Sequence, residues 1–155
     1  MQLTASDIRG ISVFADAPDD DAEWLISVIE ARTFEAGDEP FEVDAPANQM
    51  MIVFSGAIQF HIRQGERWSI FGTWRTGSLT GRLPYSRMET FPGKIIVIEP
   101  TVLGFVHMQH YRELLFRLPN SGQRLVELLS DRVRFSTQRD NEHEKMMALG
   151  RLSAG

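Results

Sequence analysis

The pattern of apolar and polar positions divides the chain into a helical start, a long β region and a helical end. Near the N-terminus, apolar residues recur every three or four positions, as on a helix with one buried face. This spacing predicts a short helix and turn over residues 3–14 and an amphipathic helix over residues 19–31. Asp19, Asp20 and Asp21 open the second helix, where acids oppose the helix dipole, and we interpret them as a cap rather than a metal site.

The middle of the chain consists of short apolar runs separated by turn residues. The run at residues 50–54 has the composition of a buried strand, and the others alternate or are bounded by glycine and proline. Strands are predicted at residues 33–34, 40–43, 50–54, 57–63, 68–71, 95–98 and 102–106. Many short strands with turns between them indicate an antiparallel sandwich or barrel.

Helical spacing returns after residue 108. Residues 109–118 place their apolar side chains on one side, and Pro119 follows. Asn120 or Ser121 is a candidate cap for a second helix, which continues past residue 133 towards the end of the chain. The expected fold class is therefore α+β, mainly β: a jelly-roll-like antiparallel β-roll with N-terminal helices and two C-terminal helices, the last extended as a connector.

Glycines and cations gather in one stretch, residues 72–94, between two predicted strands. Glycine lets backbone N–H groups approach a ligand closely, and successive N–H groups in turns form concavities that bind anions. The cations Arg82, Arg87 and Lys94 could add charge-assisted hydrogen bonds to a phosphate or carboxylate. The alternative interpretation is a surface loop with solvated charges.

Composition narrows the functional classes. The 155 residues fit one domain with an appendage, and the net charge of −5 argues against non-specific binding to nucleic acid or an anionic membrane. The absence of cysteine excludes disulfides and thiol chemistry, and no apolar run is long enough to cross a bilayer. We therefore expect a cytoplasmic protein without nucleic-acid or membrane partners. His61, His107, His110 and His143 suggest no metal site, and the chain as given shows no catalytic constellation.

The order of predicted elements resembles a cyclic nucleotide-binding domain over roughly residues 8–135. The likeness includes Ala36-Gly37-Asp38 before the barrel, the strand and turn at residues 51–56 (MIVFSG), and residues 72–83 (GTWRTGSLTGRL), which resemble the start of that family's phosphate-binding cassette. The resemblance implies a β-roll whose helices move when a ligand such as cAMP or cGMP binds. Taken with the glycines and cations of the same stretch, it gives a predicted ligand-binding set: Gly81, Arg82, Leu83, Arg87, Phe91, Gly93 and Lys94.

The cassette departs from the family pattern at three positions. Ser78 replaces a common aspartate, Arg82 stands where the family's glutamate holds the ribose hydroxyl, and Phe91 stands where its phosphate-binding arginine belongs. An arginine cannot accept a hydrogen bond from a hydroxyl. We therefore expect the usual ligand to be lost. The alternatives are weak binding of a cyclic nucleotide and binding of a different small anion.

The tail carries a second resemblance. Residues 144–155 (EKMMALGRLSAG) are similar to the start of the dimerisation and phosphoacceptor helix of a sensor histidine kinase. This implies a domain over residues 1–135 and a connector over residues 136–155, which would lead into an ATP-dependent parent kinase that acts on a response regulator.

Three functions follow from these patterns. The first is a ligand-sensing input module that dimerises through its C-terminal helices, with Leu125, Val126, Leu129 and Val133 at the interface. The second is a degenerate domain that binds no nucleotide and serves as a dimerisation or partner-binding scaffold. The third is a transcription regulator of the same fold, which would need a helix-turn-helix after Val133.

Overall fold

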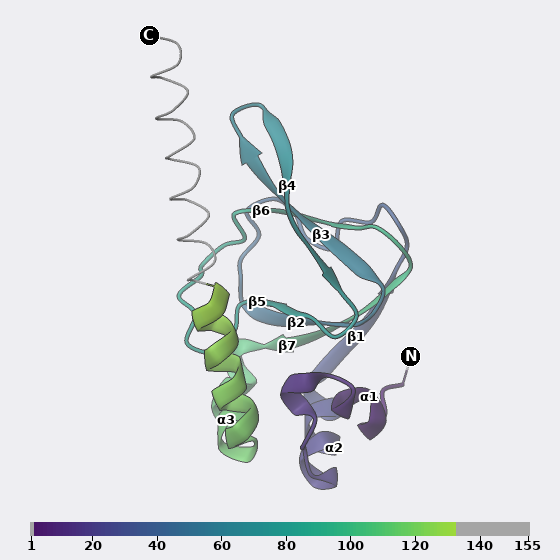
Figure 1. Ribbon diagram of the computed structural model, residues 1–155, viewed down its shortest axis with the longest axis vertical. Coiled ribbons are helices and arrows are strands. Elements are labelled where there is room, and N and C mark those ends of the chain that lie inside the picture. Colours follow the sequence, from purple (N-terminus) through teal and green to yellow (C-terminus); the bar gives the residue numbers. More distant parts are fainter. Residues whose placement is uncertain (1, 133–155) are drawn as a thin grey trace.

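The computed structural model describes residues 2–132, in which a β-roll stands above a group of helices (Figure 1). The helices are α1 (Ala5–Arg9), the 3-10 helix η1 (Ser12–Phe14), α2 (Asp19–Val28), the 3-10 helix η2 (Met108–His110) and α3 (Tyr111–Arg117). The strands are β1 (Ile29–Phe34), β2 (Gln49–Ser55), β3 (Ala57–Gln64), β4 (Arg67–Arg75), β5 (Leu79–Gly81), β6 (Gly93–Val97) and β7 (Thr101–His107). Residues 119–132 are also helical, and we call them the C-terminal helical segment.

Two antiparallel sheets form the β-roll. One has the strand order β1-β7-β2-β5 and the other β4-β3-β6, so neighbours in each sheet are often far apart in sequence. A bulge between Phe60 and His61 interrupts the β3–β4 ladder, which adds twist to this long hairpin. The arrangement confirms the predicted fold class, a mainly β, jelly-roll-like antiparallel roll with helices at both ends of the chain.

Strand β2 separates the two hydrophobic clusters of the molecule. Successive side chains of a strand point to opposite faces of the sheet, and β2 is apolar on both. Met50 and Ile52 pack towards the helices, whereas Met51 and Val53 pack between the sheets. This explains why residues 50–54 read as a continuous apolar run rather than an alternating one.

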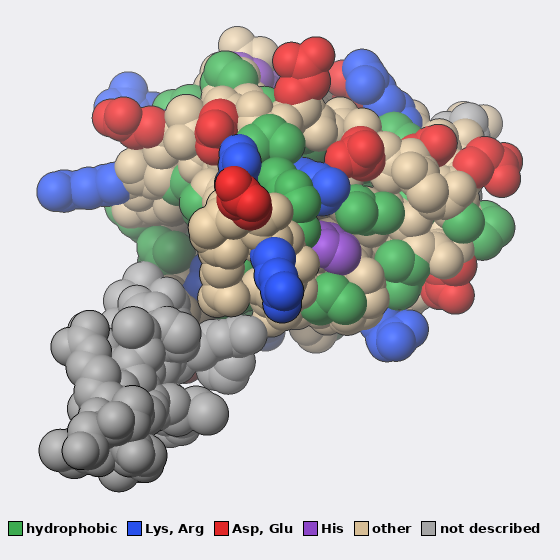
Figure 2. Space-filling model, turned by 90° about the horizontal axis from the view of Figure 1, so that it is seen from above, with side chains coloured by type: hydrophobic (Ala, Val, Ile, Leu, Met, Phe, Trp, Pro, Cys, Tyr) green, Lys and Arg blue, Asp and Glu red, His purple; other side chains and the backbone are tan. Residues whose placement is uncertain are grey.

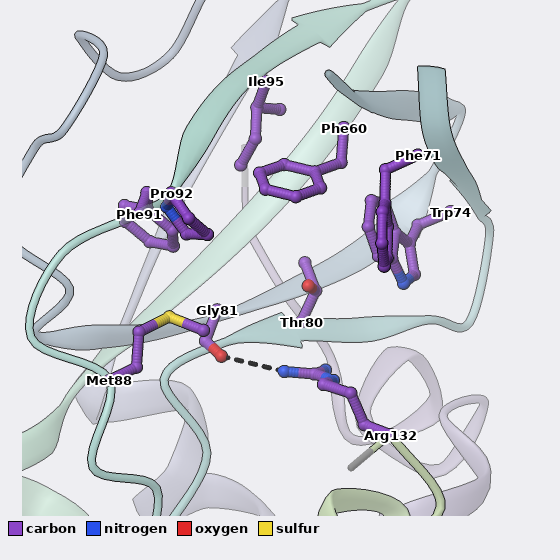
Figure 3. Close-up of a pocket in the computed structure, with 10 residues that line it drawn as sticks. All are labelled: Phe60, Phe71, Trp74, Thr80, Gly81, Met88, Phe91, Pro92, Ile95 and Arg132. Carbon is purple, nitrogen blue, oxygen red and sulfur yellow. Dashed lines mark hydrogen bonds between the residues drawn. The ribbon is translucent and has the colours of Figure 1, made fainter. Parts of the chain in front are cut away.

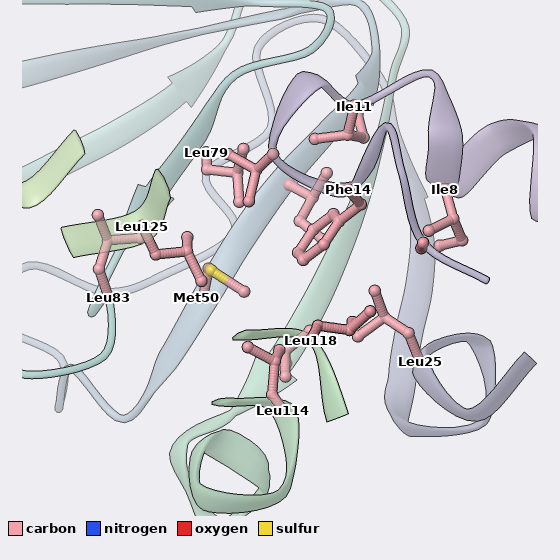
Figure 4. Close-up of a cluster of buried hydrophobic side chains, with 14 of the residues drawn as sticks. Ile8, Ile11, Phe14, Leu25, Met50, Leu79, Leu83, Leu114, Leu118 and Leu125 are labelled. Carbon is pink, nitrogen blue, oxygen red and sulfur yellow. The ribbon is translucent and has the colours of Figure 1, made fainter. Parts of the chain in front are cut away.

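The cluster on the helical side joins both ends of the chain (Figure 4). The helices contribute fully or nearly fully buried side chains, and the sheet closes the cluster from the other side. Its buried members include Ile8, Ile11, Phe14, Leu25, Met50, Leu79, Leu83, Leu114, Leu118 and Leu125. Helices predicted from two distant stretches thus share one core, which fixes the start of the C-terminal helical segment against the β-roll.

The cluster between the sheets contains several aromatic rings that contact one another. Phe41 stacks on Phe91 with ring centroids 5.0 Å apart, and it meets Phe105 edge to face at 5.8 Å. These contacts tie the segment before β2 to the segment before β6. Residues 40–43 are therefore held by side-chain packing and do not form the strand predicted there.

Two predicted boundaries are corrected. Helix α2 ends at Val28 rather than at residue 31, because β1 begins at Ile29 and pairs with β7 over six positions from Ile29 to Phe34. The stretch at residues 72–94 is not one continuous loop, since β4 reaches Arg75 and β5 and the start of β6 also lie within it.

The C-terminal helical segment begins two to three residues earlier than the predicted caps imply. Pro119 is its first helical residue, a position that suits proline because that N–H has no partner within the helix. The N–H of Gly122 donates to the carbonyl of Leu118 at 2.9 Å, so neither Asn120 nor Ser121 is the cap. Val133 and the predicted connector at residues 136–155 lie outside the described residues. Within residues 2–132, no helix is long and apolar enough to cross a membrane.

Candidate functional site

A pocket of about 200 Å³ opens where the inter-sheet cluster meets the C-terminal helical segment. Strands β3, β4, β5 and β6, the loop at residues 82–92 and one helical residue supply its walls (Figure 3). The lining residues are Phe60, Phe71, Trp74, Thr80, Gly81, Met88, Phe91, Pro92, Ile95 and Arg132. The pocket therefore draws on residues separated by more than half of the described chain.

Two glycines allow the strands around the pocket to approach each other. Gly81 has a φ of +82°, and a Cβ there would lie 2.7 Å from the carbonyl oxygen of Gln49 on β2. A Cβ on Gly93, at the start of β6, would lie 2.1 Å from the carbonyl oxygen of His61. A side chain at either position would push the strands apart, so these glycines are needed for the close packing beside the pocket.

The walls of the pocket are mainly aromatic. Phe60 meets Phe71 edge to face at 5.6 Å and Trp74 at 5.9 Å. Phe91 faces the same space from the other side, together with Pro92 (Figure 3). Seven of the ten lining residues are apolar or aromatic, and the hydroxyl of Thr80 is one of the few polar groups.

The charged member of the lining is Arg132, which comes from the C-terminal helical segment. Its Nη1 donates to the carbonyl of Gly81 at 3.0 Å, and its Nη2 donates to the carbonyl of Leu79 at 3.2 Å. Within residues 2–132, no aspartate or glutamate forms a salt bridge with this guanidinium. Burial lowers the pKa of Arg132, because the guanidinium loses part of its hydration there.

Sequence reasoning did not single out Arg132. Its partners are the carbonyls of β5, about fifty residues earlier, and they belong to the backbone and carry no sequence signature. The only available signal was an arginine one position before Val133 on an otherwise apolar helical stripe. That pattern usually describes a solvated helix face.

Of the predicted ligand-binding residues, the structure brings Gly81 and Phe91 into the pocket. Gly93 is buried beside it at the start of β6. Leu83 instead packs in the cluster on the helical side, with 1% of its surface exposed. Leu83 therefore anchors the start of the loop at residues 82–92 to the helical-side cluster and does not face the pocket.

The three predicted cations do not line the pocket. Arg82 donates its side-chain Nη1 to the carbonyl of Ala47 at 3.2 Å, and its backbone N–H donates to the carbonyl of Gln49 at 3.0 Å. Lys94 lies over the ring of Trp68 at 4.6 Å, a cation–π contact, and neither of these residues lines the pocket. Arg87 is exposed. In this conformation Arg132 replaces them as the pocket's positive charge.

One polar contact connects the helices to the pocket region, and another connects the helices to each other. The Tyr111 hydroxyl, on α3, donates to the carbonyl of Arg82 and lies 3.4 Å from the carbonyl of Val106. Burial raises the pKa of this phenol, because the ionised form would lose its hydration. Arg124 donates to both carboxylate oxygens of Asp16, at 2.8 and 3.3 Å, and so holds the C-terminal helical segment against the N-terminal helices.

The surface above the β-roll is electrostatically mixed. On the face shown in Figure 2, acidic and basic side chains alternate with scattered apolar ones, and no broad area of one sign forms. Among residues 2–132, no group of three or more histidine, aspartate or glutamate side chains is placed to hold a metal ion. Among residues 2–132, the aromatic pocket and Arg132 combine apolar surface with a positive charge.

Comparison with known proteins shows what this fold is similar to. No protein-family model and no curated protein sequence matches the chain. Among solved structures, the catabolite activator protein of Thermus thermophilus matches 83% of this chain with a TM-score of 0.71 and 20% identity. A cyclic nucleotide-binding domain from Methylobacillus flagellatus matches 86% of this chain, and 82% of its own length, with a TM-score of 0.69 and 15% identity. The regulatory domain of Toxoplasma gondii PKA, crystallised with cAMP, matches 82% of this chain with a TM-score of 0.68 and 12% identity.

These likenesses establish the fold, which is that of a cyclic nucleotide-binding domain. The chain spans 61% of the length of the Thermus protein and 48% of that of the Toxoplasma protein. The resemblance expected from the sequence is thus confirmed for the fold of the domain. The predicted kinase context rests on residues outside the described part of the chain.

Proposed function

We propose that this chain is a regulatory input domain that binds a small anionic ligand in the aromatic pocket and signals through its C-terminal helical segment. The observation that supports this most directly is the position of Arg132. This one side chain lines the pocket and also fastens the helical segment to the carbonyls of Gly81 and Leu79. A ligand that engages Arg132 therefore acts on the helix that leads out of the domain.

The mechanism is a competition for the guanidinium. In the structure, two of its N–H groups donate to carbonyls of β5, and these bonds hold the helix beside the pocket. An anion offers a stronger, charge-assisted partner than a neutral carbonyl. The helix responds only to the extent that the ligand binds one helix position better than the other.

The output that we propose is a sensor histidine kinase. Its support is the sequence of residues 144–155, which resembles the start of a dimerisation and phosphoacceptor helix. In this proposal the domain works in the cytoplasm as a homodimer, is not itself an enzyme, and controls an ATP-dependent parent kinase that acts on a response regulator. The Thermus catabolite activator protein and the N-terminal domain of a Streptomyces coelicolor transcriptional regulator have similar folds, which supports transcription control as an alternative output.

A second candidate is a scaffold that binds no nucleotide. Two observations favour it. Arg82 is hydrogen-bonded to the protein's own backbone. Phe91 stands in the sequence where the family's phosphate-binding arginine is expected, and its ring stacks on Phe41. In this case the fold would hold the C-terminal helical segment for dimerisation or partner contact, and the pocket would remain empty.

Movement of the helical segment distinguishes the two candidates. The chain has no cysteine, so a single pair, Glu66→Cys on the β3–β4 turn and Glu127→Cys on the helical segment, can carry spin labels without further changes. We expect the label-to-label distance distribution, measured by pulsed electron spin resonance, to change with a bound ligand. The panel contains cAMP, cGMP and small organic anions. If no compound at millimolar concentration changes either this distribution or the melting temperature, the scaffold is the better description.

A further inference from the structure

The pocket is the open end of the inter-sheet hydrophobic cluster. Phe91 and Ile95 belong to that cluster and are almost fully buried, yet both also line the pocket. Phe60 and Trp74 pack partly against the same cluster from the facing strands. A ligand placed here would therefore contact ring faces and edges on most sides, and flat apolar groups benefit most from such contacts.

The volume of the pocket indicates how large a group it can bury. An apolar cavity of about 150 Å³ is large enough for benzene, whereas pockets for drug-sized ligands measure about 300–1,000 Å³. At about 200 Å³, this pocket lies just above the lower of these sizes. One ring or two fused rings with a short substituent would fill it.

The positive charge of Arg132 at one end of the pocket indicates that the ligand's substituent is negatively charged. Arg132 presents a planar guanidinium that donates to two neutral carbonyl oxygens, those of Gly81 and Leu79. A poorly solvated cation without a carboxylate partner favours the arrival of an anion. A second negative charge on the same ligand would be buried among aromatic rings, so a single charge fits best.

A cyclic nucleotide fits these surroundings poorly. Its ribose hydroxyl needs an acceptor, and the lining contains no aspartate or glutamate. Its purine and sugar oxygens also need partners, while Thr80 and Arg132 are the main polar side chains available. Each polar group left without a hydrogen bond on burial reduces the affinity substantially.

We infer that the ligand of this pocket is a compact aromatic monoanion, with one or two fused rings against Phe60, Trp74 and Phe91 and its anionic group on the Arg132 guanidinium. The inference rests on the proposed function and specifies its ligand class. It also moves the anion-binding residue from the loop at residues 82–92 to the C-terminal helical segment.

The test uses the full 155-residue chain and matched probes. Isothermal titration calorimetry compares phenylacetate and indole-3-acetate with their neutral amides, and with acetate, inorganic phosphate, cAMP and cGMP. We expect each aromatic acid to bind about ten- to a hundredfold more tightly than its amide, because only the acid forms a charge-assisted hydrogen bond. Acetate and inorganic phosphate lack the ring and should bind at least tenfold more weakly than the aromatic acids.

Two variants assign the charge preference to one residue. In Arg132→Gln the ratio of acid to amide affinity should fall to about one, and in Arg132→Lys it should be partly retained. Arg87→Gln removes an exposed arginine on the nearby loop and should leave the ratio unchanged. Circular dichroism establishes that each variant is folded. The acid-to-amide ratio of the wild-type protein needs no variant at all.

The possible outcomes separate this inference from the proposed function. Equal binding of acid and amide, or a ratio that survives in Arg132→Gln, overturns the inference. Tighter binding of cAMP or cGMP than of the aromatic acids also overturns it but leaves the sensing function in place. Aromatic acids that bind through Arg132 without changing the spin-label distances would support the inference and contradict the proposed function. If no probe binds and the distances never change, both fail.

Discussion

At the scale of single residues, Gly81 sets how closely β5 lies to β2 at the edge of the pocket. Its φ of +82° and the 2.7 Å approach of an added Cβ to the Gln49 carbonyl are separate obstacles to any side chain. We expect Gly81→Ala to lower the free energy of unfolding by more than the 1–2 kcal/mol that positive φ alone costs an alanine. Urea unfolding measures the loss.

Gly37→Ala is the matched control for this substitution. Gly37 also has a positive φ, of +95°, but an added Cβ would have nothing within 4 Å. The difference between the two losses reports the steric contact at Gly81. Equal losses in the two variants would show that β5 can move away from β2 at little cost in free energy, and that the edge of the pocket deforms easily.

The residue scale also shows where sequence reasoning succeeds and where it fails. Gly81 and Phe91 were identified because glycine and a family cassette leave a pattern at fixed spacing. Arg82 was assigned to a ligand because its side chain is charged, yet its nearest acceptor is the backbone carbonyl of Ala47, 35 residues earlier. Arg132 was missed because its acceptors are also backbone carbonyls, those of Gly81 and Leu79. Neither partner can be read from the sequence, because a carbonyl exists at every position and only the fold selects one.

At the scale of elements, Tyr111 couples α3 to the loop that borders the pocket. Its hydroxyl donates to the carbonyl of Arg82, and its ring is 9% exposed. We expect Tyr111→Phe to lower the free energy of unfolding by about 1–3 kcal/mol, because it leaves that carbonyl without a donor in a buried place. Chemical denaturation at pH 7 checks this value, and an unchanged stability would mean that water replaces the hydroxyl.

The same phenol predicts how stability depends on pH. Burial raises the pKa of Tyr111 in the folded state above its unfolded value of about 10. The folded protein therefore keeps the proton at a pH where the unfolded chain releases it, and stability falls as pH rises above about 10. The contribution of Tyr111 to this fall approaches about 1.4 kcal/mol per pH unit. The wild-type protein should lose stability more steeply than Tyr111→Phe between pH 10 and 11, and parallel curves would contradict the assignment.

Element boundaries were harder to predict than the elements themselves. The apolar run at residues 50–54 predicted β2 well, because burial on both faces leaves a strong local signal. The end of α2 was placed three residues late, since residues 29–31 can continue the helix locally and only pairing with β7 makes them a strand. Residues 40–43 look extended in isolation, and it is the stacking of Phe41 on Phe91 that holds them without a sheet partner.

At the scale of the whole molecule, the C-terminal helical segment packs against its own domain. In the proposed function it also contacts a second copy of the chain. The apolar residues of this segment differ in how deeply they are buried. Leu125 is fully buried in the helical-side cluster, and Leu129 packs partly against it. Leu125 therefore belongs to the core of the single chain, which corrects its predicted place at a dimer interface. Val126, by contrast, is 40% exposed.

This difference in burial predicts opposite effects of two neighbouring substitutions. Leu125→Ala should lower the free energy of unfolding by about 2–5 kcal/mol, the usual range for a fully buried leucine. Val126→Asp should change it by no more than about 1 kcal/mol, because the side chain already contacts solvent. If the proposed homodimer forms through this face, Val126→Asp places a charge in it and should convert the dimer to a monomer.

Sedimentation equilibrium over a range of concentrations measures the dimer, and denaturation of the same samples measures folding. Asp131→Asn, an exposed change on the same segment, is the control for altered charge alone. A wild-type chain that is monomeric at every concentration, or a Val126→Asp chain that remains dimeric, would rule out this face as the interface.

A helical segment that carries a ligand-contacting arginine on one side and a partner on the other would link occupancy of the pocket to assembly. In that case, an Arg132-dependent ligand should also shift the monomer–dimer equilibrium.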